Sequence, residues 1–355
     1  SGPLVFDILC PFYGRYGLSR GTSWCADMLR LIRAFVRDVI SWKSVIKCTD
    51  NEGGTILHSI IKSYFHNERN KEGIIACLEI IMCELDREER FKLLAGQDFA
   101  GCNLVYQTLE ASHFDCPWLV TILNAVAQVL EDEHIHLVFL RSQCRQDGDT
   151  LVHVLLEEVA CGLSYGENRC DYQISLLKEL LRIDDNPRTG VKLLSRRNIH
   201  GKTPLHLVRL DKVLFGLIEG FAEIDKYRLL SVLDDSGNTP IHCLSSLTSG
   251  VAGRILLYNP FLKLMQSKNF AGKTALHKIS EKKKLSNAAA LLRESDDLVI
   301  ADMLCLKDGD GKSIIHDSLQ LDFHGSCYDD FDARWHRSDA IKSLLEVLAV
   351  LKNKT

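Results

Sequence analysis

The sequence lacks an apolar run long enough to cross a bilayer, and neither sign of charge dominates it. Its formal net charge is −4 at pH 7, and 25% of its residues are charged. A membrane-spanning helix needs about 20 consecutive apolar residues. Binding to nucleic acid or to an anionic surface usually depends on an excess of basic residues. We therefore expect no membrane segment and no nucleic-acid partner.

Features of secretion are missing as well. The chain begins Ser1-Gly2-Pro3, with no initiator methionine and no signal-peptide layout, and we expect it to be part of a longer protein. The 13 cysteines lack the even spacing of a disulfide framework. Because 355 residues can bury a real core, we expect buried, reduced thiols and a location in the cytoplasm or nucleus. Four of the cysteines lie in helical segments: Cys77, Cys83, Cys243 and Cys305.

Sustained apolar–polar alternation, the pattern of β-strands, is also absent. Instead, a six-residue phrase recurs seven times: a glycine, a Thr-like residue two positions later, and a His-like residue three positions after that. The glycines are 48, 47, 53, 36, 35 and 39 residues apart. An internal period of about 20–50 residues indicates a stacked array of repeats. The seven phrases are Gly53–His58, Gly101–Tyr106, Gly148–His153, Gly201–His206, Gly237–His242, Gly272–His277 and Gly311–His316.

Each phrase predicts a tight turn followed by a capped helix. A Thr or Ser at the third position can accept hydrogen bonds from the free amides of a helical first turn. Pro204 and Pro240 then fall at the first helical position, which suits proline. In six copies an Asp or Asn stands three residues before the glycine, which is turn chemistry; the third copy has Arg145 there. The six residues are Asp50, Asp98, Asn198, Asp234, Asn269 and Asp308.

Amphipathic segments with apolar residues at i, i+3 and i+4 follow most first helices and predict second helices. They are 74–81, 118–130, 174–181, 285–292 and 341–351. The repeats are longer than two helices require, so we place the extra residues in insertions between the helices or after the second helix. These insertions are 64–72, 86–97, 110–116, 160–171 and 321–338.

Several motifs that suggest chemistry do not hold together. Three phrases contain Gly-Lys-Thr or Gly-Lys-Ser, but a phosphate-binding loop needs a glycine five residues upstream, where Arg196, Ser267 and Leu306 stand. The histidines occur one per repeat, whereas a catalytic site would need one unusual histidine. Residues 324–336 lack the spacing of zinc ligands, and 308–319 lack the acidic residue that ends a calcium loop. We expect no catalytic residue, no cofactor and no metal site.

With these Thr-Pro-Leu-His-like phrases, residues 45–351 resemble the ankyrin repeat family, whose units are about 33 residues long. The resemblance implies an all-α, ankyrin-type solenoid of helix–turn–helix repeats joined by hairpin turns. It also implies that the Thr-like and His residues hydrogen-bond within and between neighbouring turns. The second copy departs from the pattern with Asn103 and Tyr106.

The resemblance implies a non-catalytic scaffold or adaptor that binds a protein partner, and we expect a monomeric array. Two alternatives stay open. One is a regulatory domain of a larger enzyme or channel, and the other is a module that senses nucleic acid or nucleotide.

Residues 1–44 precede the first phrase and predict an N-terminal helical cap, continuous with an array over 45–355 in one domain. The segment 29–40 predicts an amphipathic helix with a basic face. A cap would cover the apolar side of the first repeat, because the ends of a stacked array need a polar cover. A partner-binding helix is the alternative.

Partners of ankyrin arrays commonly dock on the turn tips and the concave surface, and the resemblance implies the same here. The tips are the two residues before each glycine, and exposed apolar side chains there are candidate anchors, unless they pack against a neighbouring turn. An acidic insertion in the seventh repeat carries aromatic residues suited to a basic partner, unless it folds over the last helix. The candidate partner-binding residues are Phe99, Ile199, Asp235, Phe270, Asp310, Tyr328, Phe331 and Trp335.

Overall fold

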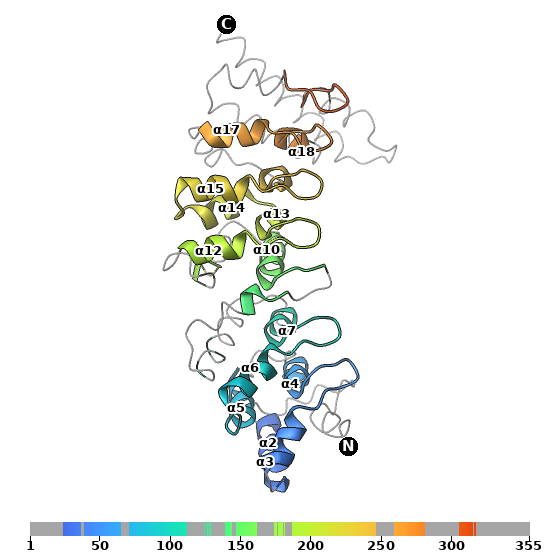
Figure 1. Ribbon diagram of the computed structural model, residues 1–355, viewed down its shortest axis with the longest axis vertical. Helices are drawn as coiled ribbons and strands as arrows, with labels where there is room; N and C mark the ends of the chain where they lie inside the picture. The colour runs from blue at the N-terminus through green and yellow to red at the C-terminus, as the bar shows by residue number, and fades with distance from the viewer. Residues whose placement is uncertain are drawn as a thin grey trace, which may run out of the picture. The chain divides into compact units, whose positions relative to one another are not determined.

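The computed structural model describes helices linked by tight turns (Figure 1). The described residues are 24–36, 39–64, 71–111, 139–143, 147–161, 187–245, 259–280 and 305–314, with further positions at 124, 126, 128, 316 and within 174–181. Within these ranges there are isolated β-bridges, such as that between Thr49 and Thr55, but no strands. The same ranges contain no helix that is long and apolar enough to span a membrane. The predicted all-α fold class is confirmed.

Each phrase glycine closes a tight turn with a positive φ, between 68° and 80°. We number the repeats 1 to 7 by these glycines. In repeat 5, Asp234 Oδ1 accepts hydrogen bonds from the backbone N–H groups of Ser236 at 2.9 Å and Asn238 at 2.8 Å. One side chain thus satisfies two amides that the loop would otherwise leave unpaired. The same pair of bonds is made by Asp50, Asp98, Asn198, Asn269 and Asp308.

A first helix follows each of the first six turns, beginning just after the Thr-like residue as predicted. These helices are α4 (Ile56–Tyr64), α7 (Leu104–Ala111), α10 (Leu151–Cys161), α13 (Pro204–Leu207), the 3-10 helix η3 (Pro240–Cys243) and α18 (Ala275–Ser280). The helices of repeats 4 and 5 have only 4 residues each and begin with proline. Proline fits this position because the first N–H of a helix has no partner within the helix.

Second helices are described in repeats 1 and 4, as α5 (Lys71–Met82) and α14 (Asp211–Ile218). The predicted helix at 74–81 lies within α5, and 174–181 is helical at the positions that are described. The predicted second helices at 285–292 and 341–351 lie outside the described residues, as does all of 118–130 except three helical positions.

The predicted insertion at 86–97 is a helix, which corrects the sequence interpretation. This helix, α6 (Arg87–Ala95), begins at a capping box: Asp86 Oδ1 accepts from the Glu89 N–H at 2.8 Å, and the Glu89 carboxylate accepts from the Asp86 N–H at 3.3 Å. It is a third helix of repeat 1. Matching helices precede the turns of repeats 4, 5 and 6, namely α12 (Pro187–Leu194), α15 (Glu223–Leu230) and α17 (Asn259–Gln266).

Each third helix ends in two adjacent buried apolar residues, and the second of them stands four residues before the turn Asp or Asn. The pairs are Leu93 and Leu94, Leu193 and Leu194, Leu229 and Leu230, and Leu264 and Met265. An eight- or nine-residue helix is only marginally stable by itself, so this anchoring pair supplies much of what holds it in place. The other predicted insertions lie outside the described residues, except where they overlap the ends of α4, α5, α7 and α10.

The N-terminal cap consists of two helices, α2 (Trp24–Phe35) and α3 (Val39–Ile46), where the sequence predicted one helix over 29–40. The helix α2 packs against α5 of repeat 1, and the capping role of residues 1–44 stays a prediction. Trp42 and Ile46 of α3 are fully buried. Ile46 stands four residues before Asp50, so α3 occupies the position of a third helix ahead of the first turn.

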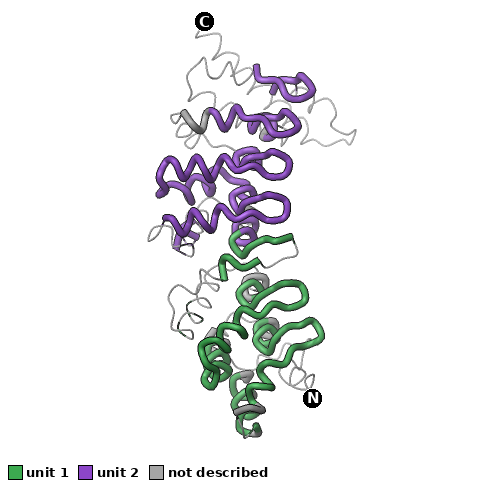
Figure 2. Tube along the Cα trace, viewed as in Figure 1, with its two compact units in different colours: residues 1–152 green, residues 153–355 purple. Residues whose placement is uncertain are grey.

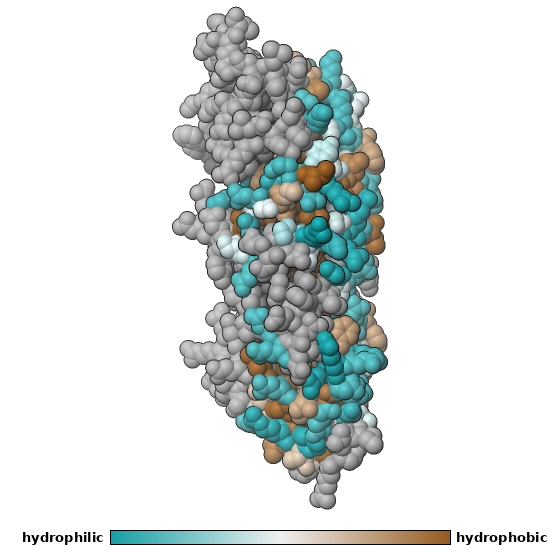
Figure 3. Space-filling model, turned by 60° about the vertical axis from the view of Figure 1, so that its left-hand side comes forward, coloured by the Kyte–Doolittle hydropathy of each residue, from teal (hydrophilic) through white to brown (hydrophobic). Residues whose placement is uncertain are grey.

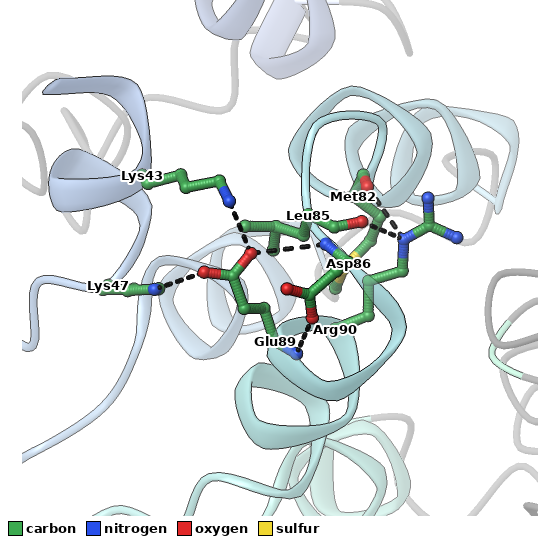
Figure 4. Close-up of polar contacts among 7 residues, drawn as sticks. All are labelled: Lys43, Lys47, Met82, Leu85, Asp86, Glu89 and Arg90. Atoms are coloured by element: carbon green, nitrogen blue, oxygen red, sulfur yellow. Dashed lines mark hydrogen bonds and ion pairs between the residues drawn. The ribbon is translucent and has the colours of Figure 1, made fainter. Parts of the chain in front are cut away.

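Ion pairs connect α3 to α6 (Figure 4). The Glu89 carboxylate lies 2.7 Å from Lys43 Nζ and 2.9 Å from Lys47 Nζ. These two hydrogen bonds lower the pKa of Glu89 to about 2, and the same contact raises the pKa of Lys43. Arg90 Nε donates to the carbonyls of Met82 and Leu85, at 3.0 and 2.8 Å, and so fixes the bend between α5 and α6.

The chain divides into two compact units, residues 1–152 (unit 1) and 153–355 (unit 2), with the division inside α10 (Figure 2). In unit 1, the first helices α4 and α7 pack side by side. In unit 2, α13, η3 and α18 form a row of first helices, and α12, α15 and α17 form a second row (Figure 1). Each unit is therefore a stack of repeats. The predicted single domain over 45–355 stays a prediction.

Candidate protein-interaction surface

A histidine links repeats 1, 3, 4, 5 and 6 to the turn that follows. In repeat 4, the backbone N–H of Thr203 donates to His206 Nδ1 at 3.0 Å, and the Thr203 hydroxyl lies 2.8 Å from the same nitrogen. On the other side of the ring, His206 Nε2 lies 3.0 Å from the Asn238 carbonyl in the next turn. The equivalent contact with the following turn is made by His58, His153, His242 and His277. The predicted structural role of these histidines is confirmed.

These contacts fix the tautomer of the His206 imidazole, and burial keeps the ring neutral. A backbone N–H can only donate, so Nδ1 of His206 must accept, and the ring proton is on Nε2, which donates to the carbonyl. Burial disfavours the charged ring and lowers the pKa of His206 to about 4. Burial also lowers the pKa of His242. A ring with both nitrogens bonded to its own backbone is in no position to act on a substrate.

Repeat 2 has different residues, Asn103 and Tyr106, at the positions of the Thr–His pair. Asn103 Oδ1 accepts from the Tyr106 backbone N–H at 2.9 Å and so caps α7 in place of threonine. Its amide then donates to the Ser142 hydroxyl at 2.7 Å, 39 residues along the chain. Asn103 is buried, and its amide supplies both the cap of α7 and a contact with Ser142, which follows the helical residues 139–141. The hydrogen bonding of this divergent copy is therefore intact.

Neighbouring turns are also joined backbone to backbone. In each case the donor is the backbone N–H of the residue that follows the turn Asp or Asn. The acceptor is the carbonyl of the residue just before the phrase glycine of the preceding repeat. The pairs are Phe99 with Glu52, Asp235 with His200, Phe270 with Ser236, and Gly309 with Ala271, at 2.8, 3.1, 3.1 and 3.3 Å. Each pair lies within one compact unit. The tips are thus held at fixed positions relative to one another within each unit.

The two predicted phenylalanine tips are exposed and lie across a glycine of the preceding turn. Phe99 is 79% exposed and Phe270 is 76% exposed. A Cβ added to Gly53 would come within 2.7 Å of the Phe99 ring, and one added to Gly237 within 2.6 Å of the Phe270 ring. Each ring therefore has one face against backbone and the other toward solvent. Both rings thus pack against a neighbouring turn, as the alternative predicted, and yet stay largely exposed, so their role as anchors stays a prediction.

The other described tip candidates are exposed too. Ile199, at the same position in repeat 4, is 64% exposed. Asp235 and Asp310 are exposed at the tips of repeats 5 and 7. Asp235 Oδ1 lies beside Gly201, as Phe99 and Phe270 lie beside their glycines. In unit 2, two apolar tips therefore flank an acidic one.

The remaining candidates, Tyr328, Phe331 and Trp335, lie outside the described residues, so the aromatic insertion of repeat 7 stays a prediction.

At two junctions of unit 2, the residue after the phrase glycine lies near the Asp or Asn of the next turn. Asn269 Nδ2 donates to Asn238 Oδ1 at 2.8 Å. At the equivalent junction between repeats 6 and 7, an Asp replaces the Asn and a lysine, Lys273, faces it. Burial tends to raise the pKa of Asp308, but the N–H groups of Lys312 and Asp310, with nearby His277 and Lys273, lower it below its usual value. The Gly-Lys-Thr lysine at position 273 thus complements a turn acid.

Sequence reasoning missed two exposed apolar residues on or next to α15, Ile224 and Leu233. On the face in Figure 3, apolar side chains are interspersed with hydrophilic ones over the described surface. Two of the cysteines predicted to be buried, Cys83 and Cys305, are exposed, whereas Cys77 is buried. Cys83 lies next to the end of α5, beyond its buried stripe, and a helical pattern alone does not fix which face is covered.

Comparison with known proteins adds little to this geometry. No protein-family model matches the chain, and no curated protein matches it. Among solved structures, the chain is similar to the ankyrin repeat domain of Bcl-3, described as a member of the IκB protein family. The identity is 12% over 75% of this chain and 95% of that one, with a TM-score of 0.38. The turns and histidine bridges described above, rather than this likeness, carry the ankyrin-type fold.

Proposed function

We propose that the chain is a non-catalytic scaffold or adaptor that binds a protein partner through its turn tips and the adjoining concave surface. The observation that carries the proposal is the exposure of Phe99, Ile199 and Phe270 at one equivalent position of three repeats. Large apolar side chains contribute little to the core when most of their surface faces water, and clusters of them mark interaction sites. Aromatic anchors of this kind dominate the binding energy of many interfaces.

The preformed turns also lower the entropic cost of binding a partner. Each tip is closed by its Asp or Asn side chain and bonded to its neighbour, so the rings are presented on a preformed backbone. Ordering flexible loops on association costs free energy, and a preformed tip avoids most of that cost. Asp235 and Asp310 supply polar groups beside the apolar anchors. In the proposal, the aromatic insertion at 321–338 adds a contact for a basic segment of the partner.

The test is a comparison of cross-linking and capture in a cell extract of the cytoplasm and nucleus. A photoreactive phenylalanine analogue replaces Phe99 or Phe270, and a matched control places it at Leu31, a 54% exposed residue of α2. We expect both tip positions to cross-link the same protein and position 31 not to do so. The double variant Phe99→Asp/Phe270→Asp should lose that protein while its thermal unfolding is unchanged. Retention of the protein by a folded double variant would show that the tips are not the binding site.

A further inference from the structure

The hairpins of unit 2 carry a row of basic side chains. We call the residue just before each turn Asp or Asn the arm residue. It is Arg197 in repeat 4, Leu233 in repeat 5, Lys268 in repeat 6 and Lys307 in repeat 7, and all four are exposed. The hairpins of unit 2 stack one above another (Figure 2), and their turns are bonded backbone to backbone. The arm residues therefore form a line of three cations interrupted by one apolar side chain.

The turn does not require a charge at this position. In repeats 1 and 2 the arm residues are Thr49 and Gln97, which are exposed but neutral, and their turns close with the same Asp bonds. The chain as a whole has a net charge of −4, so an aligned row of cations stands apart from its composition. A single surface lysine is ordinary, whereas a row of one sign creates a field that attracts the opposite charge.

The cations of the row are not neutralised within the chain. Among the described residues, no acidic side chain forms an ion pair with Arg197, Lys268 or Lys307. Asp235 Oδ1 and Arg197 Nη2 both lie beside Gly201, but they do not pair. Arg197 Nε donates to the Gly201 carbonyl at 3.0 Å, and its Nη2 donates to the Leu233 carbonyl at 2.6 Å. A cation is thus fixed next to Leu233, whose side chain is 44% exposed.

The rest of each hairpin adds to this field more than it cancels it. The residue after the glycine is a lysine in the same three repeats, at positions 202, 273 and 312. Of the acidic residues, Asp234 and Asp308 are buried in their turns, where backbone N–H groups bind their carboxylates. Asp235 and Asp310 are at the tips. The arm row itself contains no acid.

We propose that the arm row of unit 2 binds an extended, acidic segment of a protein partner. The first helices of repeats 4 to 6 pack in a row, and packed helices lie about 8–10 Å apart. An extended chain advances about 3.3 Å per residue, so about three residues span one repeat. The segment sets acidic residues against Arg197, Lys268 and Lys307 and an apolar residue against Leu233. Its pattern is acidic-x-x-apolar-x-x-acidic-x-x-acidic, in either direction along the row.

A protein segment suits this row better than a nucleic acid does. The phosphates of a nucleic acid repeat at every nucleotide, and some would face Leu233 and the tip acids Asp235 and Asp310. Binding of single strands also relies on aromatic side chains on which bases stack, and the arm row has none. The inference does not depend on the proposed function, since the arm residues and the apolar tips are different residues.

The test is selection from a library of random peptides of about twelve residues, long enough to span the row, on the immobilised full chain at low salt. We expect enriched peptides to carry the predicted pattern and to bind less tightly as the salt concentration rises. Lys268→Glu/Lys307→Glu should bind these peptides at least tenfold more weakly. Peptides with lysine in place of the two matching acids should bind this variant at least tenfold better than they bind the wild type.

The matched control is Lys192→Glu/Lys263→Glu, which changes the net charge equally at exposed lysines of α12 and α17. It should bind the peptides like the wild type, as should Ile199→Ser/Phe270→Ser, which removes two apolar tips. Thermal unfolding of each variant checks that the fold is retained. Enrichment without the acidic pattern, an equal loss in the lysine control, or a failed charge exchange would overturn the proposal. Displacement of the peptides by a single-stranded oligonucleotide at equal charge concentration would do so in favour of a nucleic acid.

Discussion

Units 1 and 2 use the same turn but hold their repeats together differently. In unit 2, repeats 4 to 7 follow one another with backbone bonds between turns and a histidine bridge at each junction. Unit 1 has one such bridge, at His58, whereas Asn103 of repeat 2 bonds to Ser142, ahead of the next turn. It also relies on side-chain contacts with the cap, such as the Lys43–Glu89 and Arg33–Glu84 ion pairs. An imidazole is therefore not present at this position in every repeat.

The largest effect should come from a glycine that lies against the backbone of the next turn. Gly272 has φ +73°, and a Cβ there would come within 2.4 Å of Gly309 N. Gly272→Ala must therefore adopt a left-handed conformation and also separate two turns of unit 2. The left-handed conformation costs about 1–2 kcal/mol. With the separation of the turns added, we expect the free energy of unfolding to fall by about 3 kcal/mol. Region-resolved hydrogen exchange would report the loss in the amides of repeats 6 and 7.

Gly101 of unit 1 is the matched control. Its φ is +80°, but a Cβ there would meet no atom within 4 Å. Gly101→Ala should cost only the conformational term, about 1–2 kcal/mol. Equal losses for the two variants would contradict the role assigned to the close approach of turns in unit 2.

The second effect concerns the histidine bridge and pH. His206→Ala leaves the Thr203 N–H without its acceptor and removes one of the two hydrogen bonds to the Asn238 carbonyl inside a buried junction, and we expect the free energy of unfolding to fall by about 3 kcal/mol at pH 7. The folded pKa of His206, about 4, is below the ordinary value of 6.5, so its contribution is complete above pH 6.5 and declines as the pH falls toward 4. The difference in the free energy of unfolding between wild type and His206→Ala should therefore narrow by about 2 kcal/mol between pH 7 and pH 4.5.

Asn103→Ala in unit 1 provides the contrast for this experiment, because its amide does not titrate. Urea unfolding followed by region-resolved hydrogen exchange, at both pH values, would measure the stability lost in each variant. The cost of Asn103→Ala should be the same at pH 7 and pH 4.5. A parallel pH dependence in the two variants would mean that His206 is not the titrating group.

The smallest effect is expected at the cap of unit 1. Glu89→Gln removes the charge that pairs with Lys43 and Lys47 but keeps the shape of the side chain. Because these groups face solvent, we expect a fall in melting temperature of only about 1–2 °C at pH 7. The lowered pKa of Glu89, about 2, means that the pair stabilises above pH 4.5 and is lost below it, so wild type and variant should converge near pH 2. A difference that grows as the pH falls would exclude this pairing.

The turns and the tips could be predicted from the sequence because their chemistry is local. An Asp or Asn three residues before a glycine fixes the loop, and a tip such as Phe99 then has nowhere to be buried. The third helices could not be predicted in this way. The helix α6 has only Leu93 and Leu94 as buried residues in a largely charged segment, which gives no 3.6-residue period. Its stability comes from the capping box at Asp86 and from contacts with α3, residues distant in sequence.

The exposed face of α15 escaped prediction for a related reason. Its sequence offers two sets of apolar residues, Ile224 with Tyr227 and Leu229 with Leu230. Packing against α12 and α17 buries Leu229 and Leu230 and leaves Ile224 exposed. Comparison among the repeats themselves, once their turns are aligned, reveals the unusual position.

The matching of each turn to the next has a consequence for how such an array can evolve. Asn238 suits the asparagine that follows it, and Lys273 suits the aspartate that follows it. Deletion of repeat 6 by unequal recombination would bring Asn238 against Asp308 and leave that carboxylate without its lysine. Repeats of this chain are therefore not interchangeable modules, and selection should preserve their order as well as their number.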